Sequence, residues 1–166
     1  MKIIFLDIDG VLNSKKWFLS PEQAEKESYI EKSFDPKAVE LLNTILKETS
    51  AKIVVSSSWR LWMSVEELAE LLNGRWVIGE IIWKTPNLRS KGKEVKRGEE
   101  IEYWLNNNDL EIKEYIIIDD DSDMLSSQKN NFIHTSFETW LTKQSVTKSI
   151  KILNNKLVSS PKLNNL

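Results

Sequence analysis

Short runs of consecutive apolar residues recur along the chain, and longer stretches with apolar residues at helical spacing lie between them. The first run, 2–6, is rich in β-branched residues, shows no alternation with polar residues and stops at Asp7. This pattern is typical of a strand that is covered on both faces of a sheet. Four further runs of the same character are predicted strands, at 52–55, 76–78, 115–118 and 132–133.

Capping sequences mark where helices begin between these runs. The segments 20–23 and 64–67 both match the capping box, and Asp35 is an N-cap residue followed by proline in the first turn. We therefore predict helices at 21–32, 36–49, 65–73, 97–106 and 137–156, with a break in the last one near Thr142.

Strands that alternate with helix-length segments imply right-handed crossovers and a parallel sheet with helices on both faces. We therefore predict an α/β fold with a doubly wound, three-layer, Rossmann-like parallel sheet. In such folds ligands bind beyond the carboxyl ends of the strands. A chain of 166 residues has room for one such domain. We expect it to span residues 1–158, followed by a frayed tail at 159–166.

Composition narrows the possible chemistry. The absence of cysteine excludes disulfides, thiolate zinc sites and cysteine nucleophiles. The net charge of -2 gives no overall attraction to polyanions, so any phosphate site must be local. No apolar stretch has the length of a signal-peptide core or a membrane span. We expect a cytoplasmic protein with no membrane contact and no obligate protein partner.

Polar and charged side chains cluster directly after three of the predicted strands. The groups are Asp7 and Asp9 after the first strand, Ser56 to Arg60 after the second, and Asp119 to Asp123 after the fourth. A basic run, 91–97, lies before the helix predicted at 97–106. Because the carboxyl ends of parallel strands meet at one edge, acids, hydroxyls and a cation come together there. An EF-hand calcium loop does not fit the first group, because Val11 and Phe18 stand where further oxygen ligands are required.

These side chains meet the requirements of phosphoryl transfer: an in-line nucleophile, neutralised phosphoryl oxygens and a proton donor for the leaving oxygen. Asp7 is the candidate nucleophile, which would form an aspartyl phosphate, and Asp9 is the candidate general acid and base. Ser56 and a cation would hold the phosphoryl oxygens, and Mg²⁺ would offset the repulsion between carboxylate and phosphate. Further candidates for binding the substrate phosphate are Ser57, Arg60 and Lys96.

In these features the chain resembles the haloacid dehalogenase (HAD) superfamily over about residues 1 to 142. The four motifs are Asp7-Ile8-Asp9-Gly10-Val11, Ser56, a basic residue at a helix start, and the acidic pair Asp119-Asp120. Longer strings at 7–13, 54–60 and 97–105, together with Thr85-Pro86, resemble a narrower branch, the phosphatase-like domains associated with RNA repair proteins. The resemblance implies an HAD-type phosphatase.

The resemblance also implies a Mg²⁺ site and roles for the motif residues. The implied metal ligands are the Asp7 carboxylate, the Asp9 main-chain carbonyl and the Asp120 carboxylate. Gly10 would support the first motif, and Asp119 would orient the cation of the third. Arg97 is our first choice for that cation, and Lys96 is the alternative. The register of the acids along 119–123 stays open, because three successive aspartates fit the fourth motif.

Asp9 favours phosphate esters, because family members that cleave carbon–halogen bonds lack this second aspartate. The inserts 14–34 and 61–96 are too short for a cap domain, so we expect a minimal cap or none. An uncovered site admits large substrates, and we expect a nucleotide or the phosphorylated end of an RNA or DNA strand. The candidate surface for it comprises Lys84, Arg89, Lys91, Lys93 and Lys96 with Trp59, Trp62 and Trp83. The alternative is a solvated loop beside tryptophans of the core.

Two other classes of function stay open. A phosphoacceptor signalling domain also uses strand-end acids, Mg²⁺ and a cation, but its acceptor follows the third strand, where we expect Gly79 and Glu80. A catalytically silent HAD-like module that binds phosphate or nucleic acid would keep the same fold. The single histidine, His134, is expected to be structural, and 92–98 lacks the ending of a P-loop.

Overall fold

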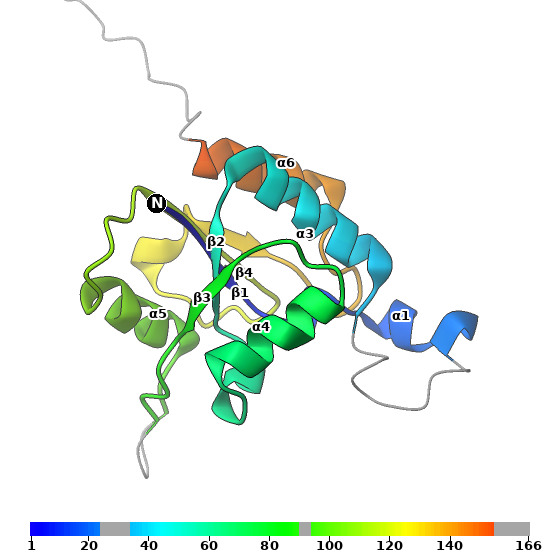
Figure 1. Ribbon diagram of the computed structural model, residues 1–166, viewed down its shortest axis with the longest axis horizontal. Helices are drawn as coiled ribbons and strands as arrows, with labels where there is room; N and C mark the ends of the chain where they lie inside the picture. The colour runs from blue at the N-terminus through cyan, green and yellow to red at the C-terminus, as the bar shows by residue number, and fades with distance from the viewer. Residues whose placement is uncertain (24–33, 90–93, 155–166) are drawn as a thin grey trace, which may run out of the picture.

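Five parallel strands form the central sheet of the computed structural model, which describes residues 1–23, 34–89 and 94–154 (Figure 1). The strands are β1 (Lys2–Leu6), β2 (Lys52–Val55), β3 (Ile81–Lys84), β4 (Glu114–Asp119) and β5 (Phe132–His134). Their order is β3-β2-β1-β4-β5, so the chain winds outward from β1 in both directions. This confirms the doubly wound topology predicted from the sequence, with its switch point between β1 and β4.

Helices that begin at capped first turns connect these strands. They are α1 (Lys15–Phe18), α3 (Pro36–Thr49), α4 (Val65–Gly74), α5 (Arg97–Asn106) and α6 (Lys143–Leu153), with the 3₁₀ turns η1 (Pro21–Gln23), η2 (Ser58–Leu61) and η3 (Ser126–Gln128). The Asp35 carboxylate accepts the backbone N–H of Lys37 at the start of α3. Ser64 and Glu67 form the reciprocal bonds of a capping box at the start of α4. These bonds satisfy N–H groups that have no partner within the helix.

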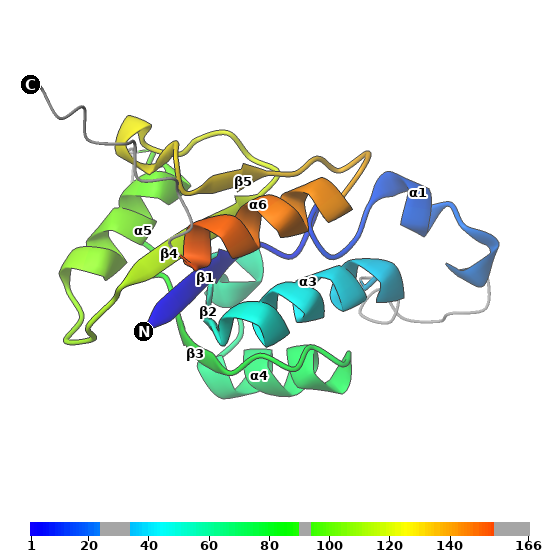
Figure 2. The same ribbon diagram turned by 90° about the horizontal axis from the view of Figure 1, so that it is seen from above.

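Two hydrophobic cores lie on opposite faces of the sheet. Residues of α3, α4 and α6 form one core, in which Leu42 and Leu68 pack with Leu6 of β1. α5 covers the other face, and Figure 2 shows it apart from α3 and α6. In this second core the rings of Phe5 and Trp104 meet edge to face, with centroids 5.4 Å apart. The fold is therefore the predicted three-layer α/β arrangement.

Strand alternation decides which way the residues beyond the strands are directed. Phe5, Val54 and Ile117 belong to the core beneath α5. Side chains two residues further along a strand point to the same face. The residues at those positions are Asp7, Ser56 and Asp119. The sheet thus brings two acids and a hydroxyl to the α5 side of its carboxyl edge.

The strand predicted at 76–78 is wrong, because the third strand is β3. After α4 the chain turns back at Trp76, whose φ of 63° lies in the left-handed region. The side chain of Asn43 in α3 then bonds both the Trp76 carbonyl and the Ile78 N–H. These backbone groups are held by α3, so the segment packs against a helix instead of pairing with β2.

The helix predicted at 137–156 begins only at Lys143. Trp140 has a φ of 43°, which no helix tolerates, and Thr142 then caps α6 by accepting the N–H of Ser145. The helix predicted at 21–32 begins as η1, and residues 24–33 lie outside the described part of the chain. The predicted boundary at 158 and the tail 159–166 also lie outside it.

The described residues of the inserts 14–34 and 61–96 contain α1, η1, α4 and β3, and they form no separate cap domain. Lys91 and Lys93 of the basic run are not among them. None of the helices in the described ranges combines the length and the apolar character that crossing a membrane requires.

Candidate active site

Asp7 and Asp119 lie side by side at the switch point of the sheet, and Arg97 joins them. Asp7 directly follows β1, and Asp119 is the last residue of β4, which pairs with β1. The Arg97 Nη1 group donates to Asp7 Oδ1 at 2.8 Å and to Asp119 Oδ2 at 2.9 Å. The side chain of Asp119 is fully buried, and those of Asp7 and Arg97 are 6% and 14% exposed. Two predicted acids and one predicted cation are therefore in direct contact.

The first turn of α5 determines which basic residue reaches these acids. Asp123 Oδ2 accepts the backbone N–H of Arg97, and Glu99 accepts that of Lys96. The turn fixed in this way directs Arg97 toward the sheet and leaves Lys96 exposed. Of the two candidate cations, the structure thus brings Arg97 to the acids and leaves Lys96 at the helix surface.

The acids of the site lie close together and are only partly compensated by Arg97. Burial raises the pKa of Asp7, although Arg97 opposes this shift. Burial and the adjacent Asp7 raise the pKa of Asp119 to about 8, and the same two causes raise the pKa of Asp120. Burial would lower the pKa of Arg97, but Asp7 and Asp119 raise it by more. The remaining negative charge favours a second cation at this position.

Three carboxylates form a cluster that fits a divalent metal ion. Asp7, Asp119 and Asp120 each offer one oxygen, and these oxygens lie within 4.8 Å of one another. Carboxylate oxygens are the hard ligands that Mg²⁺ prefers. The cluster also bears on the open register of the acidic motif, because Asp120 joins it while Asp123 caps α5. The main-chain carbonyl of Asp9 stays a predicted ligand.

Gly10 allows the first motif to approach Asp120. Its φ is 71°, a conformation that other residues rarely adopt. A β-carbon at this position would overlap the carboxyl group of Asp120. The glycine is therefore required by the close approach of two segments that contribute to the acid cluster.

Replacing Gly10 by alanine is expected to displace Asp120 and to weaken Mg²⁺ binding by about 10- to 100-fold, as when groups that orient metal ligands are lost. Thermal unfolding with Mg²⁺ and with EDTA measures the effect, because a bound ion raises Tm. The Mg²⁺-dependent rise in Tm should shrink in Gly10→Ala. It should persist in Gly74→Ala, since a β-carbon at Gly74 meets nothing within 4 Å. An undiminished rise in Gly10→Ala would contradict the assignment of Asp120.

Two neutral N–H groups hold the carboxylate of Asp9. Asn13 Nδ2 donates to Asp9 Oδ1 at 2.8 Å, and Trp59 Nε1 donates to Asp9 Oδ2 at 2.9 Å. Trp59 is only 9% exposed, so it does not belong to the open stacking surface for which it was a candidate. Sequence reasoning missed both contacts. The one available signal was that Asn13 and Trp59 lie within the segments 7–13 and 54–60, which resemble the family motifs.

The serine loop after β2 supplies two buried hydroxyls with different partners. The Ser57 hydroxyl donates a hydrogen bond to Asp7. Ser56 Oγ is buried and has no hydrogen-bond partner within the described part of the chain. The backbone N–H of Ser56 bonds the carbonyl of Leu6, which ties this loop to the end of β1. Ser56 therefore carries a hydroxyl that a ligand oxygen would satisfy.

Arg60 does not have the position expected of a phosphate-binding cation. Its side chain is 6% exposed and forms a buried ion pair with Glu100 of α5. The remaining bonds of its guanidinium go to the main-chain carbonyls of Ser56, Ser57 and Thr85. Arg60 thus holds the serine loop, the loop after β3 and α5 together. We correct its predicted role from substrate binding to support of the site.

The fold, the strand-end acids and the bridging arginine define an HAD-like domain. The family model of the HAD domain in Swiss Army Knife RNA repair proteins matches residues 3–146, and the chain belongs to this family. The matched range includes every candidate site residue from Asp7 to Asp123. No curated protein and no solved structure matches the chain significantly. Membership supports an HAD-type, phosphatase-like module in which a metal ion would fit the acid cluster.

Proposed function

We propose that the domain is a Mg²⁺-dependent phosphomonoester hydrolase that forms an aspartyl phosphate on Asp7. One observation carries the proposal: Asp7 of the acid cluster contacts Arg97, and on the same side of the sheet the Ser56 hydroxyl has no hydrogen-bond partner among the residues that the structure describes. A nucleophile, a cation, a hydrogen-bond donor and a metal site thus converge where a phosphoryl group would bind.

In the first step Asp7 attacks phosphorus, the bond from phosphorus to the leaving oxygen breaks, and Asp9 gives its proton to that oxygen. In the second step Asp9 takes a proton from water as the water oxygen attacks phosphorus, and the bond to Asp7 breaks. Ser56 donates to a phosphoryl oxygen, and Arg97 orients Asp7. The metal ion, held by Asp7 and Asp120 with the main-chain carbonyl of Asp9, would neutralise charge on the phosphoryl oxygens.

Phosphate release from a generic aryl phosphate, measured with Mg²⁺ and with EDTA, tests this proposal. Turnover that requires Mg²⁺ is the expected result. Binding of the ester without turnover in either condition would instead identify a catalytically silent module. A protein that accepts phosphate from a small phosphodonor and retains it would be a signalling domain. That class has less support, because β3 ends at Lys84 and is followed by Thr85, not by an acid.

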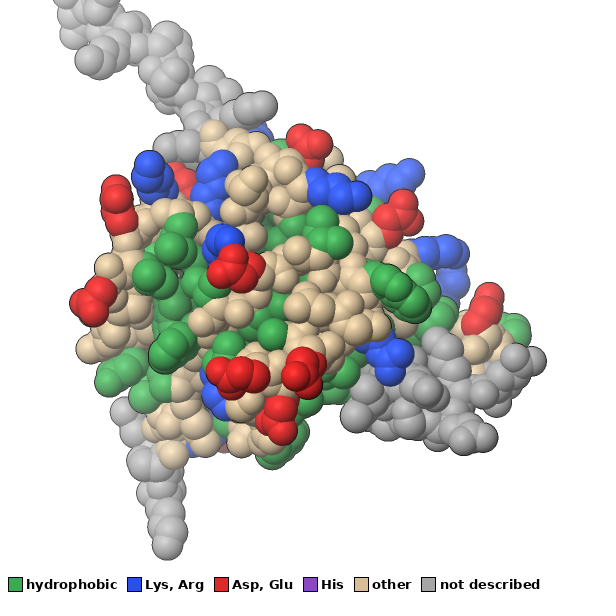
Figure 3. Space-filling model, viewed as in Figure 1, with side chains coloured by type: hydrophobic (Ala, Val, Ile, Leu, Met, Phe, Trp, Pro, Cys, Tyr) green, Lys and Arg blue, Asp and Glu red, His purple; other side chains and the backbone are tan. Residues whose placement is uncertain are grey.

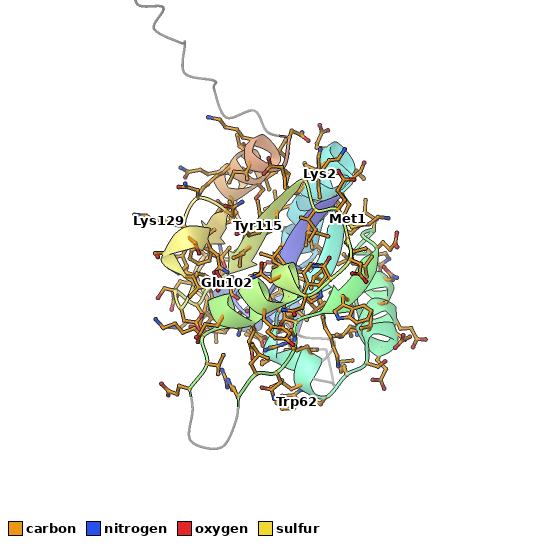
Figure 4. All side chains as sticks on the ribbon, turned by 90° about the vertical axis from the view of Figure 1, so that its left-hand side faces the viewer. Met1, Lys2, Trp62, Glu102, Tyr115 and Lys129 are labelled. Carbon is orange, nitrogen blue, oxygen red and sulfur yellow. The ribbon has the colours of Figure 1, made fainter. Side chains whose placement is uncertain are left out.

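Exposed aromatic side chains support a nucleotide or a polynucleotide end as the substrate. A groove of about 920 Å³ lies beside α5 and β3, and Figure 3 shows hydrophobic side chains gathered on that side. The lining of this groove extends from Met1 to Arg60 of the serine loop and does not include the strand-end acids. Its lining includes Trp83, Tyr103, Thr85 and Pro86. Trp62, which is 75% exposed, lies at the end of the molecule opposite Met1 (Figure 4). Because β1 begins beside Met1, that opposite end carries the carboxyl ends of the strands, where exposed aromatic rings could stack on bases.

Replacing Trp62 by alanine is expected to raise KM for an oligonucleotide with a terminal phosphate by about tenfold, since stacking contributes about 1–3 kcal/mol per base. KM for a small alkyl phosphate should not change, because it has no base to stack. Trp76→Ala is the matched control: Trp76 is 73% exposed but lies before β3, at the opposite edge of the sheet. Equal effects of the two variants would argue against a base-stacking role for Trp62.

A further inference from the structure

The geometry points to Asn13 and Trp59 as a pair of positioning residues that hold Asp9 in the orientation needed for proton transfer. Each donates one N–H to a different oxygen of the same carboxylate, at 2.8 Å and 2.9 Å. The two donors follow neighbouring strands, since Asn13 belongs to the segment after β1 and Trp59 belongs to η2 after β2. This inference rests on the proposed function, because it assigns how the proton donor of that reaction is held.

The orientation of the Asn13 amide is determined by its second contact. Asn13 is fully buried, and its Oδ1 accepts the backbone N–H of Gly10 at 2.9 Å. A backbone N–H can only donate, so the amide oxygen faces Gly10 and the amide nitrogen must face Asp9. Asn13 therefore links the turn of the first motif to the Asp9 carboxylate in one defined orientation.

Contacts with Phe34 and Ser57 hold Trp59 in position. Its indole packs edge to face against Phe34, with ring centroids 6.2 Å apart and an interplanar angle of 78°. Its backbone N–H bonds Ser57 Oγ, the hydroxyl that contacts Asp7. The loop that carries the phosphate-binding Ser56 thus also delivers the indole N–H to Asp9. A movement of this loop would change the orientation of Asp9 together with the position of Ser56.

The chemistry of the two donors suits a carboxyl group that must exchange its proton with the substrate. Indole and amide N–H groups neither release nor take up protons at neutral pH, so Asp9 is the only member of the trio that can transfer one. Each carboxylate oxygen keeps a second lone pair, which is where the mobile proton can reside. Asn13 and Trp59 therefore fix the orientation of the Asp9 carboxyl group and do not compete with it for the proton, as general acid catalysis requires.

The test measures kcat/KM for a series of phosphate monoesters, from phenols of low pKa to simple alcohols, in the Mg²⁺-loaded protein. Trp59→Phe keeps the ring and removes the N–H. Asn13→Asp keeps an acceptor for Gly10 and replaces the amide nitrogen by an oxygen. In both variants kcat/KM should fall about tenfold or more for alkyl esters and much less for aryl esters with the most acidic leaving groups. Asp9→Asn should show the same trend, with a loss of about 10²–10⁴-fold because general acid catalysis is removed.

Trp104→Phe is the control, because it makes the same change at a tryptophan that is 5% exposed in the core beneath α5. Any decrease in kcat/KM of Trp104→Phe should be equal for all esters of the series. A direct readout of the contact is the indole N–H resonance that is absent in Trp59→Phe, which should shift in Asp9→Asn. Equal losses on all esters in Trp59→Phe and Asn13→Asp, or an unshifted resonance, would overturn the inference. Absence of turnover of every ester in the wild type would instead overturn the proposed function.

Discussion

Replacing Asp7 by asparagine is expected to abolish hydrolysis and leave the fold intact. An amide cannot attack phosphorus, so turnover should fall by more than about 100-fold, or about 3 kcal/mol in barrier height. Asparagine fills the same volume, and burial already raises the pKa of Asp7, so the loss of its charge should not lower stability. Turnover of an aryl phosphate with Mg²⁺ and the Tm of the same samples measure both parts of the prediction.

Asp121→Asn is the matched control for this variant. Asp121 belongs to the same acidic run, but its side chain is exposed and does not belong to the cluster that fits a metal ion. Its replacement should leave turnover near the wild-type value. Activity above about a hundredth of wild type in Asp7→Asn would remove Asp7 from the role of nucleophile.

Replacing Glu100 by glutamine is expected to lower the free energy of unfolding by about 3–5 kcal/mol, the usual effect of removing one partner of a buried ion pair. Glu100 is 2% exposed, and its carboxylate pairs with Arg60 and also accepts the backbone N–H of Leu88 at 3.1 Å. Burial lowers the pKa of Arg60, and Glu100 opposes that shift. Without the carboxylate a buried guanidinium stays uncompensated. Urea unfolding monitored by tryptophan fluorescence measures the change.

Glu102→Gln provides the comparison on the same helix. Glu102 lies two residues further along α5, on the exposed side visible in Figure 4. An exposed substitution of this kind usually changes stability by less than about 0.5 kcal/mol. Similar effects of the two variants would show that the ion pair between Arg60 and Glu100 does not hold the loops of the site. We also expect Glu100→Gln to lower activity, because Arg60 binds the carbonyls of Ser56 and Ser57.

Local sequence pattern was sufficient for most of the sheet. The predicted strands coincide with β1 and β2, are one residue shorter than β4 at each end, and are one residue shorter than β5 at its carboxyl end. β1, β2 and β4 are buried on both faces, so their apolar runs are unbroken and easily recognised. The position of the acids followed from the same pattern, because a parallel sheet brings the carboxyl ends of its strands to one edge. Asp7, Ser56 and Asp119 could therefore be placed together without any knowledge of their contacts.

The third strand could not be placed because two apolar runs compete for it. The segment 76–78 is as apolar as β3, and only the bonds from Asn43 and the turn at Trp76 exclude it from the sheet. Such bonds join residues more than 30 positions apart and leave no local signal. β3 is an edge strand whose Trp83 is 57% exposed, which weakens its own apolar pattern.

Long-range polar contacts explain the remaining differences at the site. Arg60 follows a serine cluster, as a phosphate-binding cation would, but its partner Glu100 lies 40 residues away. Trp59 likewise reaches Asp9 across 50 residues. Helical periodicity alone marks Glu100 only as a neighbour of Ile101, with no indication that its carboxylate is buried. Pairings of this kind depend on the completed fold, so the sequence predicted which acids come together better than which residues hold them in place.

Trapping of the proposed acyl phosphate on Asp7 tests the account most directly. Wild-type protein with Mg²⁺ and a phosphate monoester would be quenched during turnover and reduced with borohydride, which converts an acyl phosphate of aspartate to homoserine. Mass spectrometry of the peptides then locates the reduced residue. We predict homoserine at position 7 and its absence from samples without substrate. Turnover of the ester with unmodified Asp7, or with homoserine at another aspartate such as Asp119, would contradict the account.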